Sequence, residues 1–189
     1  MEKEFYARFP TILGLCTTKE ALGGIPATGR EKTDKQTSFV LKYYSYAVKA
    51  GKLFGVHPLV ILAQASIESG WGTSPLAMQG NNFFGITAYG NPNQFWKGAV
   101  YTSKTSGFKF RVYPSIEASF ADFARLIATY YKEAAQLSNN VNAYAQKISQ
   151  SKYISETGGD NREKYRALII QSANTILAIA KKKLQIQHN

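Results

Sequence analysis

Hydrophobic residues recur at helical spacing along most of this sequence, and the pattern predicts a mainly helical protein. Apolar positions three and four residues apart predict a first helix over about residues 34–51. A second apolar run covers residues 57–70, with a proline in its first turn and a glycine at its end, as is typical of helix boundaries. Similar patterns predict further helices at about residues 115–131, 140–150 and 161–183.

The helical pattern stops between residues 73 and 114, where glycine, asparagine, proline and aromatic residues dominate. Two short runs of this segment, residues 98–102 and 107–113, alternate in the manner of strands and predict a β-hairpin. Long irregular segments in compact domains usually bind something, so we expect a binding surface here. The predicted fold class is α+β, mainly α, with a small β-hairpin lobe.

The chain has the size and composition of one compact domain, with 189 residues of which 44% are hydrophobic. Residues 1–35 contain a stretch rich in glycine, proline and threonine followed by charged residues, and we interpret them as an N-terminal extension or linker. The domain itself is expected over residues 36–183, with a short C-terminal tail over residues 184–189.

The net charge of +11 and the pI near 9.7 favour a polyanionic partner, such as nucleic acid, anionic lipid or the anionic polymers of bacterial cell walls. The basic residues are dispersed, and no zinc-finger, P-loop or RNA-recognition motif accompanies them, so we expect no nucleic-acid partner. Cys16 is the only cysteine, which excludes an internal disulfide and a cysteine-based metal site. We expect no metal and no cofactor.

The apolar stretches are shorter than a membrane span, so we expect no insertion into a membrane. The longest early apolar piece, residues 12–16, is too short for the core of a signal peptide. An exported protein would then use another route, or its signal would lie outside this chain.

Glu68 is a candidate catalytic residue because it lies in the last turn of the helix predicted over residues 57–70. The carbonyl end of the helix dipole disfavours a negative charge there, and Ile61 and Ala65 place the side chain on an apolar face. Both effects raise the pKa of a carboxyl group, and a glutamate that keeps its proton beside an aromatic such as Trp71 can serve as a general acid. The competing interpretation is a surface glutamate that happens to precede a glycine turn.

Several motifs follow one another in an order that matches a known family. They are Ala63-Gln-Ala-Ser-Ile-Glu-Ser-Gly-Trp-Gly72, Asn81-Asn-Phe-Phe-Gly-Ile86, Trp96-Lys-Gly98, Phe110-Arg-Val-Tyr113, and then Tyr144-Ala145, Tyr153 and Tyr165. This ordered set, which spans roughly residues 36–180, closely resembles the bacterial β-N-acetylglucosaminidases of glycoside hydrolase family seventy-three. These are peptidoglycan hydrolases that include autolysins and flagellar rod-associated muramidase-like domains.

The resemblance implies a lysozyme-like fold in which Glu68 lies at the floor of a groove between a helical lobe and the hairpin. It also implies an endo-β-N-acetylglucosaminidase that hydrolyses peptidoglycan at the β-1,4 bond between N-acetylglucosamine and N-acetylmuramic acid, with Glu68 as the general acid. The substrate and the bond come from the resemblance alone. Such an enzyme acts on glycan strands, so the expected location is periplasmic, in the cell wall or secreted.

One feature departs from the family pattern. Residues 97–109 contain no acidic side chain, although family members commonly carry a second carboxylate in this hairpin. Many glycosidases pair an acid with a second carboxylate, but an N-acetyl sugar can supply its own 2-acetamido oxygen as the nucleophile. We therefore predict substrate-assisted hydrolysis, with Glu68 as the acid and then as the base for water. Groups that orient the acetamide are expected among Tyr101, Ser103 and Tyr153.

A second carboxylate could instead reach the groove from elsewhere in the chain. The candidates are Asp122, Glu156 and Asp160. Asp160 is favoured because it lies in a glycine-rich segment after Tyr153, whereas the helical pattern places Asp122 on a solvent face.

Aromatic residues of the loop-rich segment are candidate sugar-binding platforms, because aromatic faces suit the apolar faces of pyranose rings. The candidates are Trp71, Tyr89 and Trp96, each with core packing as the alternative. Asn82 is expected near the groove, where it would orient the acetamido group or form a turn. Arg111 is expected to be solvated or ion-paired rather than in contact with the substrate.

Two other functions are consistent with one candidate glutamate and no carboxylate in the hairpin. A lytic transglycosylase also uses one glutamate, but the Gly-Leu-Met-Gln type motif typical of that class is absent. A wall-binding or assembly module could keep this fold after losing its second acid. The products released from purified peptidoglycan distinguish the three functions.

Overall fold

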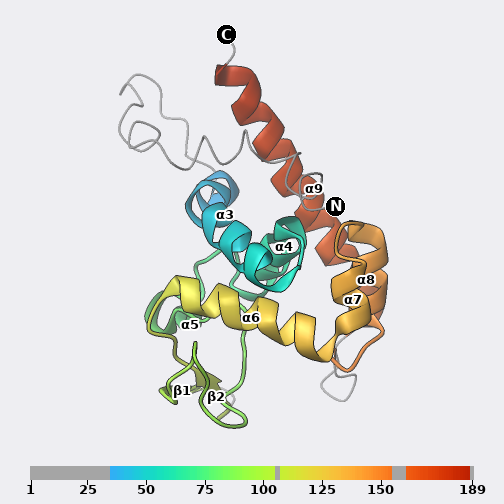
Figure 1. The fold of residues 1–189 in the computed structure, drawn as a ribbon. Helices are drawn as coiled ribbons and strands as arrows, with labels where there is room; N and C mark the ends of the chain where they lie inside the picture. Colours follow the sequence, from blue (N-terminus) through green and yellow to red (C-terminus); the bar gives the residue numbers. More distant parts are fainter. Residues whose placement is uncertain (1–34, 105–106, 155–160, 188–189) are drawn as a thin grey trace, which may run out of the picture.

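The structure is a computed structural model that describes residues 35–104, 107–154 and 161–187, with side chains described as far as Lys182. Helices dominate the described part, and a two-stranded antiparallel sheet accompanies them (Figure 1). The elements are α3 (Lys35–Phe54), α4 (Pro58–Glu68), α5 (Pro75–Gly80), β1 (Val100–Thr102), β2 (Lys109–Arg111), α6 (Ile116–Tyr130), α7 (Lys132–Gln136), α8 (Val141–Ser149) and α9 (Arg162–Gln187). The predicted class, mainly α with a small β-hairpin, is confirmed.

Helix α4 packs against α3, α6, α8 and α9 and lies at the centre of the helical part (Figure 1). Its residues 58–66 are all buried, including the polar side chain of Gln64. A helix that is apolar on all sides is stable only inside a protein, so the other helices surround it. The helix begins at His57, whose Nδ1 accepts a hydrogen bond from the Leu59 amide at 3.2 Å. Because α4 is buried over residues 58–66, it is a firm support for Glu68 at its end.

The small sheet lies at the end of the molecule opposite the C-terminal end of α9 (Figure 1). β1 and β2 pair with Tyr101 opposite Phe110, and Thr87 forms a further bridge to Phe110. The Arg111 amide also donates to the Ile86 carbonyl at 2.9 Å. These bonds tie the hairpin to the loop that follows α5.

Two short helices differ from the sequence-based expectation. α5 occupies part of the segment predicted to be irregular, and α7 follows directly after α6. They have six and five residues, too few to show a helical period. A start signal was nevertheless present for α5, because Ser74 caps the helix and Pro75 fills its first position. Helix α9 also continues to Gln187, into the segment predicted as a tail, while the predicted extension lies outside the described residues except for Lys35.

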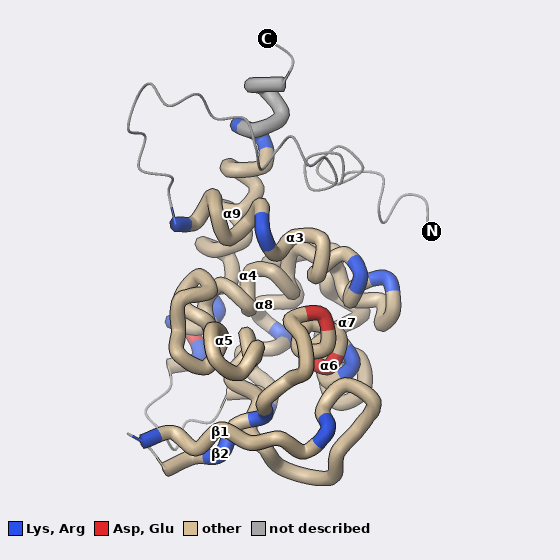
Figure 2. The backbone as a smooth tube through the Cα atoms, turned by 90° about the vertical axis from the view of Figure 1, so that its left-hand side faces the viewer, with Lys and Arg blue, Asp and Glu red and all other residues tan. Residues whose placement is uncertain are grey.

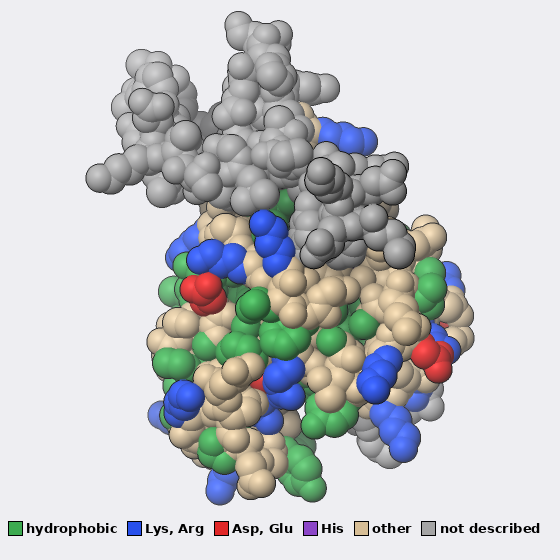
Figure 3. Space-filling view, viewed as in Figure 1, with side chains coloured by type: hydrophobic (Ala, Val, Ile, Leu, Met, Phe, Trp, Pro, Cys, Tyr) green, Lys and Arg blue, Asp and Glu red, His purple; other side chains and the backbone are tan. Residues whose placement is uncertain are grey.

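The described surface is basic without one dominant patch. Lysine and arginine occur on most of the described elements, whereas acidic residues are few (Figure 2). On the face seen in Figure 1, hydrophobic side chains gather across the middle, with basic side chains above and below them (Figure 3). Among the helices that the structure describes, none combines the length and the hydrophobicity of a membrane span.

Candidate active site

Glu68 is the last residue of α4, and a tight turn follows it. The Trp71 amide donates to the Ser66 carbonyl at 2.7 Å, and the Gly72 amide donates to Ser69 Oγ at 2.8 Å. Trp71 holds a positive φ of 60°, a conformation that is unusual for a bulky residue and is found mainly at turns and functional sites. The turn leaves the Glu68 side chain half-buried at the helix end.

A chain of hydrogen bonds leads from the protein interior to Glu68. The Tyr165 hydroxyl donates to Glu68 Oε1 at 2.7 Å, and Gln64 Nε2 donates to the Tyr165 oxygen at 2.9 Å. The Tyr144 hydroxyl donates in turn to Gln64 Oε1. Gln64 lies one helical turn before Glu68 on α4, while α8 and α9 supply the two tyrosines. Packing of α4 against α8 and α9 therefore brings these four side chains together.

Two further tyrosines extend this cluster. The ring of Tyr153 lies 6.1 Å from that of Tyr165 and 5.5 Å from that of Tyr131, measured between ring centres. Burial raises the pKa of Tyr153 and of Tyr165 well above the ordinary value, and the nearby charge of Glu68 contributes to both shifts. Both hydroxyls keep their protons at neutral pH, so they can donate hydrogen bonds but cannot act as bases. Tyr153, a predicted catalytic residue, lies in this cluster.

The other acidic residues that the structure describes are engaged with basic groups. Three form exposed ion pairs, which are Lys49–Glu117, Lys147–Glu133 and Arg166–Glu163. The fourth, Asp122, lies in a separate buried cluster. Glu156 and Asp160, the remaining predicted candidates for a second carboxylate, lie outside the described residues.

The prediction that Asp122 faces solvent is wrong, because its side chain is completely buried. It accepts hydrogen bonds from Arg111 Nη1 at 2.6 Å, the Tyr113 hydroxyl at 2.8 Å, Arg125 Nε at 2.9 Å and Asn93 Nδ2 at 3.1 Å. These donors come from β2, the residues after it, α6 and the loop before β1. Asp122 therefore anchors the hairpin lobe to α6, and the expected ion pairing of Arg111 is confirmed.

Asn82 and Trp96, each predicted as a substrate contact with a structural role as the alternative, take the structural role. Asn82 is 1% exposed, and its Nδ2 donates to the carbonyls of Ile86 and Arg111, each at 2.9 Å. Its Oδ1 accepts from the Ile86 amide at 3.1 Å and from the Phe84 amide at 3.3 Å, so no part of the side-chain amide is left for a sugar. Trp96 is 3% exposed, its Nε1 donates to the Ala99 carbonyl at 2.8 Å, and the Arg111 guanidinium lies over its ring. Both side chains stabilise the loop from its interior and are not exposed on its surface.

The remaining predicted substrate contacts are at least partly accessible. Tyr89 is 86% exposed, and its backbone carbonyl accepts a hydrogen bond from Arg111 Nη2 at 2.8 Å. A firmly held backbone thus presents an open aromatic face. Trp71, Tyr101 and Ser103 are half-buried, the latter two on and just after β1.

Gln64 and Tyr165 belong to the site but were not selected from the sequence. Tyr165 belongs to the tyrosine pattern of the family motifs, but it also lies on the apolar stripe of the predicted last helix, which indicates a core residue and no role for its hydroxyl. For Gln64 a signal was available, because it stands four residues before Glu68 in an otherwise apolar run. A polar side chain in such a run is expected to have buried hydrogen-bond partners.

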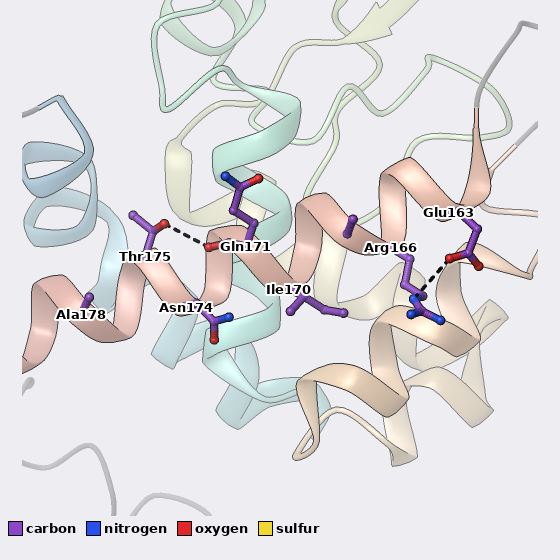
Figure 4. Close-up of a pocket in the computed structure, with 8 residues that line it drawn as sticks. Glu163, Arg166, Ile170, Gln171, Asn174, Thr175 and Ala178 are labelled. Atoms are coloured by element: carbon purple, nitrogen blue, oxygen red, sulfur yellow. Dashed lines mark hydrogen bonds and ion pairs between the residues drawn. The ribbon is translucent and has the colours of Figure 1, made fainter.

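The described surface of the helical part is hollowed in more than one place. One hollow, of about 560 Å³, lies between the end of α6, α7 and the end of α8, and Tyr131 joins it to the ring of Tyr153. Another, of about 600 Å³, follows α9 from Glu163 to Ala178 (Figure 4). All its lining residues come from one helix, so we assign it no role. Among the described residues, no group of three or more histidine, cysteine, aspartate or glutamate side chains could hold a metal ion.

Comparison with known families supports the assignment suggested by the motifs. Residues 44–178 match the model of the family described as Glucosaminidase, mannosyl-glycoprotein endo-beta-N-acetylglucosaminidase. The chain belongs to the glucosaminidase family. This match covers about half of α3, helices α4 to α8, the hairpin and most of α9.

Named relatives of this chain include a peptidoglycan hydrolase and a probable N-acetylmuramidase. The peptidoglycan hydrolase FlgJ of Vibrio parahaemolyticus is 31% identical over 140 residues, which are 66% of this chain and 44% of the relative. A probable N-acetylmuramidase of Lactococcus lactis is 33% identical over 102 residues, which are 51% of this chain and 23% of the relative. The chain thus spans less than half the length of these curated relatives.

Solved structures share the fold of this glucosaminidase. A peptidoglycan hydrolase from Sphingomonas sp. A1 is 26% identical with a TM-score of 0.57, and the match covers 76% of this chain and 94% of that one. The glycoside hydrolase domain of Salmonella typhimurium FlgJ is 24% identical with a TM-score of 0.64, over 81% and 95% of the two chains. The second likeness shows the fold alone. The chain is a glycoside hydrolase domain with the lysozyme-like fold implied by its motifs.

Proposed function

We propose that this glucosaminidase hydrolyses peptidoglycan at the β-1,4 bond between N-acetylglucosamine and N-acetylmuramic acid, on the reducing side of N-acetylglucosamine. Glu68 is its general acid and then its general base. The observation that carries the proposal is the position of Glu68, half-buried at the end of a buried helix and bound through Oε1 by the Tyr165 hydroxyl. The family and the peptidoglycan hydrolases among its relatives support the substrate class.

The net charge of +11 suits the anionic polymers of a cell wall. We therefore place the site of action at the wall, outside the cytoplasmic membrane, with glycan strands as the partner. Tyr89, with its exposed ring on a held backbone, is the proposed sugar platform, and Trp71 is a second candidate.

Because the hairpin contains no carboxylate, the proposed nucleophile is the 2-acetamido group of the substrate itself. In the proposed reaction the 2-acetamido oxygen attacks the anomeric carbon while Glu68 donates its proton to the leaving oxygen. Water then opens the resulting oxazolinium ring and gives a proton back to Glu68, so the carboxyl group is restored. Tyr153, whose hydroxyl keeps its proton, is proposed to orient the acetamide, with Tyr101 and Ser103 as further candidates. Asp160 remains the alternative as a second carboxylate.

The first experiment identifies the bond. Purified peptidoglycan is digested, and the products are reduced and weighed by mass spectrometry. New reducing N-acetylglucosamine ends support the proposal. Reducing N-acetylmuramic acid ends would indicate a muramidase, as in the name of the Lactococcus relative. Anhydromuramic acid ends would indicate a lytic transglycosylase, and no cleavage a wall-binding module.

The second experiment tests Glu68 itself. Glu68→Gln keeps the shape of the side chain and removes its transferable proton, so we expect kcat to fall about a thousand-fold. Glu117→Gln is the matched control, because Glu117 forms an exposed ion pair with Lys49 and should retain full activity. Cleavage by Glu68→Gln at the wild-type rate would show the assignment to be wrong.

The third experiment separates the two mechanisms. Under substrate assistance, glycan strands that carry a free amine in place of the 2-acetamido group are not cleaved, whereas Asp160→Asn stays active. If Asp160 is the second carboxylate, Asp160→Asn loses activity by orders of magnitude. Initial rates on both substrates for both proteins decide between them.

A further inference from the structure

A buried amide controls the direction of the hydrogen bonds that reach Glu68. Gln64 is 0% exposed and lies between the hydroxyls of Tyr144 and Tyr165. The two ends of its side chain differ, because Oε1 only accepts hydrogen bonds and Nε2 only donates them. Its orientation therefore decides which tyrosine donates to it. Here Tyr144 donates to Oε1, and Nε2 donates to Tyr165.

Tyr144 fixes the amide in this orientation. It is fully buried, and Gln64 Oε1 is the acceptor that the described residues provide for its hydroxyl. Turning the amide over would bring Nε2 against the Tyr144 hydroxyl, so two donors would face each other. A buried hydroxyl proton without an acceptor is strongly disfavoured, so the amide is held as observed.

The fixed amide determines what Tyr165 can do. A tyrosine hydroxyl has one proton, and the Tyr165 oxygen already accepts a hydrogen bond from Gln64 Nε2. Its proton is thus directed onto Glu68 Oε1, 2.7 Å away. With the amide turned over, Tyr165 would donate to Gln64 instead, and its oxygen would face Glu68 Oε1 without a hydrogen.

We propose that Gln64 is a positioning residue that acts through Tyr165. It directs the Tyr165 proton onto Glu68, which fixes the orientation of the carboxyl group and stabilises its ionised form after the proton has passed to the leaving oxygen. The inference rests on the proposed role of Glu68 as the acid.

The groups around Glu68 leave its own titration as the readout. Among the described residues, Tyr165 from α9 donates a hydrogen bond to Glu68, and the charge of Glu68 acts on Tyr153 from the segment after α8. Tyr144 from α8 and Tyr131 from the end of α6 lie behind these two tyrosines. Burial raises the pKa of each of these tyrosines, so all four remain neutral in the working pH range. A pH effect of the network is therefore an effect on the carboxyl group.

The test is the pH profile of kcat/KM on peptidoglycan for Gln64→Met, Tyr165→Phe and the double variant. Methionine keeps the length of glutamine and removes both polar ends. Loss of a hydrogen bond to the carboxylate raises the pKa of Glu68, so the alkaline limb should move up by about one pH unit in Tyr165→Phe. Gln64→Met should move it in the same direction. The double variant should match Tyr165→Phe alone, because Gln64 acts through Tyr165.

Gln171→Met is the matched control, since it makes the same chemical change at an exposed position of α9 and should leave the profile unchanged. If Gln64→Met does not fold, Tyr144→Phe replaces it, with a smaller shift in the same direction expected. Additive shifts in the double variant would overturn the proposal. An unmoved alkaline limb in Gln64→Met would also overturn it, as would an unmoved limb in Tyr144→Phe if that variant is used in place of Gln64→Met.

The proposal can fail separately from the proposed function. If the wild type does not cleave peptidoglycan, the proposed function fails, and the titration of the Glu68 carboxyl carbon is followed by carbon-13 NMR instead. The signal is assigned by its loss in Glu68→Gln. A higher midpoint in Gln64→Met than in the wild type supports the role of Gln64, and equal midpoints refute it.

Discussion

Asp122→Asn removes the charge at the centre of the buried cluster and keeps the shape of the side chain. The Asp122 side chain is 0% exposed and that of Arg111 is 10% exposed, with 2.6 Å between Oδ2 and Nη1. In the variant the Arg111 guanidinium stays buried without this counter-charge, and the new amide group offers one acceptor where two were used. Breaking a buried pair by removing one partner costs about 3–5 kcal/mol, and we expect a loss of this size.

Two more exposed ion pairs provide the comparison for this loss of stability. Arg125 is 24% exposed and binds Asp122 Oδ1 at 2.8 Å, so water can partly replace it and Arg125→Met should cost about 1 kcal/mol. Lys49 and Glu117 are 60% and 54% exposed, so Glu117→Gln should change the free energy of unfolding by less than about 0.5 kcal/mol.

Urea unfolding followed by circular dichroism measures these three changes. For Asp122→Asn the melting temperature should also fall by on the order of 10 °C. The double variant Asp122→Asn with Arg111→Met should be less destabilised than the sum of the single variants, because it removes the orphaned charge. An Asp122→Asn protein within about 0.5 kcal/mol of the wild type would refute the anchoring role.

Three further predictions follow from the geometry. Gly72→Ala should lower the free energy of unfolding by about 1–3 kcal/mol, because φ is +77° and a Cβ would lie 3.1 Å from an aromatic ring. Gly55→Ala should lower it less, because φ is +69° there but the space around a Cβ is open. Thermal unfolding of the two variants compares them. Burial lowers the pKa of His57 from 6.5 to about 4, so the stability contributed by its neutral form is present above pH 6.5 and lost as the pH falls toward 4. The loss should reach up to about 3 kcal/mol in urea unfolding, and His57→Asn, which keeps a cap, should remove this pH dependence. Tyr89→Ala should raise KM about 3–10-fold through lost stacking without lowering stability, while Tyr130→Ala, 70% exposed, should leave KM unchanged.

The long helices could be predicted from the sequence because each one buries a continuous apolar face. In α6, for example, Phe120, Phe123 and Ile127 repeat at helical spacing and are all fully buried. The position of Glu68 at a helix end followed from the same logic, because the glycine turn after it is a local signal.

The polar interior could not be predicted in this way. Asp122 lies beside the apolar stripe of α6, and periodicity alone cannot show that the hairpin lobe covers that flank with Arg111 and Tyr113. The partnership of Gln64 with Tyr144 joins residues 80 positions apart in the sequence. The partner in such a contact depends on how whole elements pack, so the local sequence does not identify it even where it marks a buried polar residue, as at Gln64.

The two buried or half-buried carboxylates of the described chain illustrate why their roles differ. Asp122 is held by two guanidinium groups in salt bridges at 2.6 and 2.8 Å, an arrangement suited to a permanent structural charge. The hydrogen bond that Glu68 accepts from Tyr165 comes from a neutral hydroxyl, which stabilises a carboxylate more weakly than a cation does. A group that must donate and regain a proton in each cycle needs both its protonated and its ionised form to be accessible at the working pH. A phenol oriented by Gln64 suits that need, because as a neutral donor it holds one carboxyl oxygen in place without adding a charge of its own.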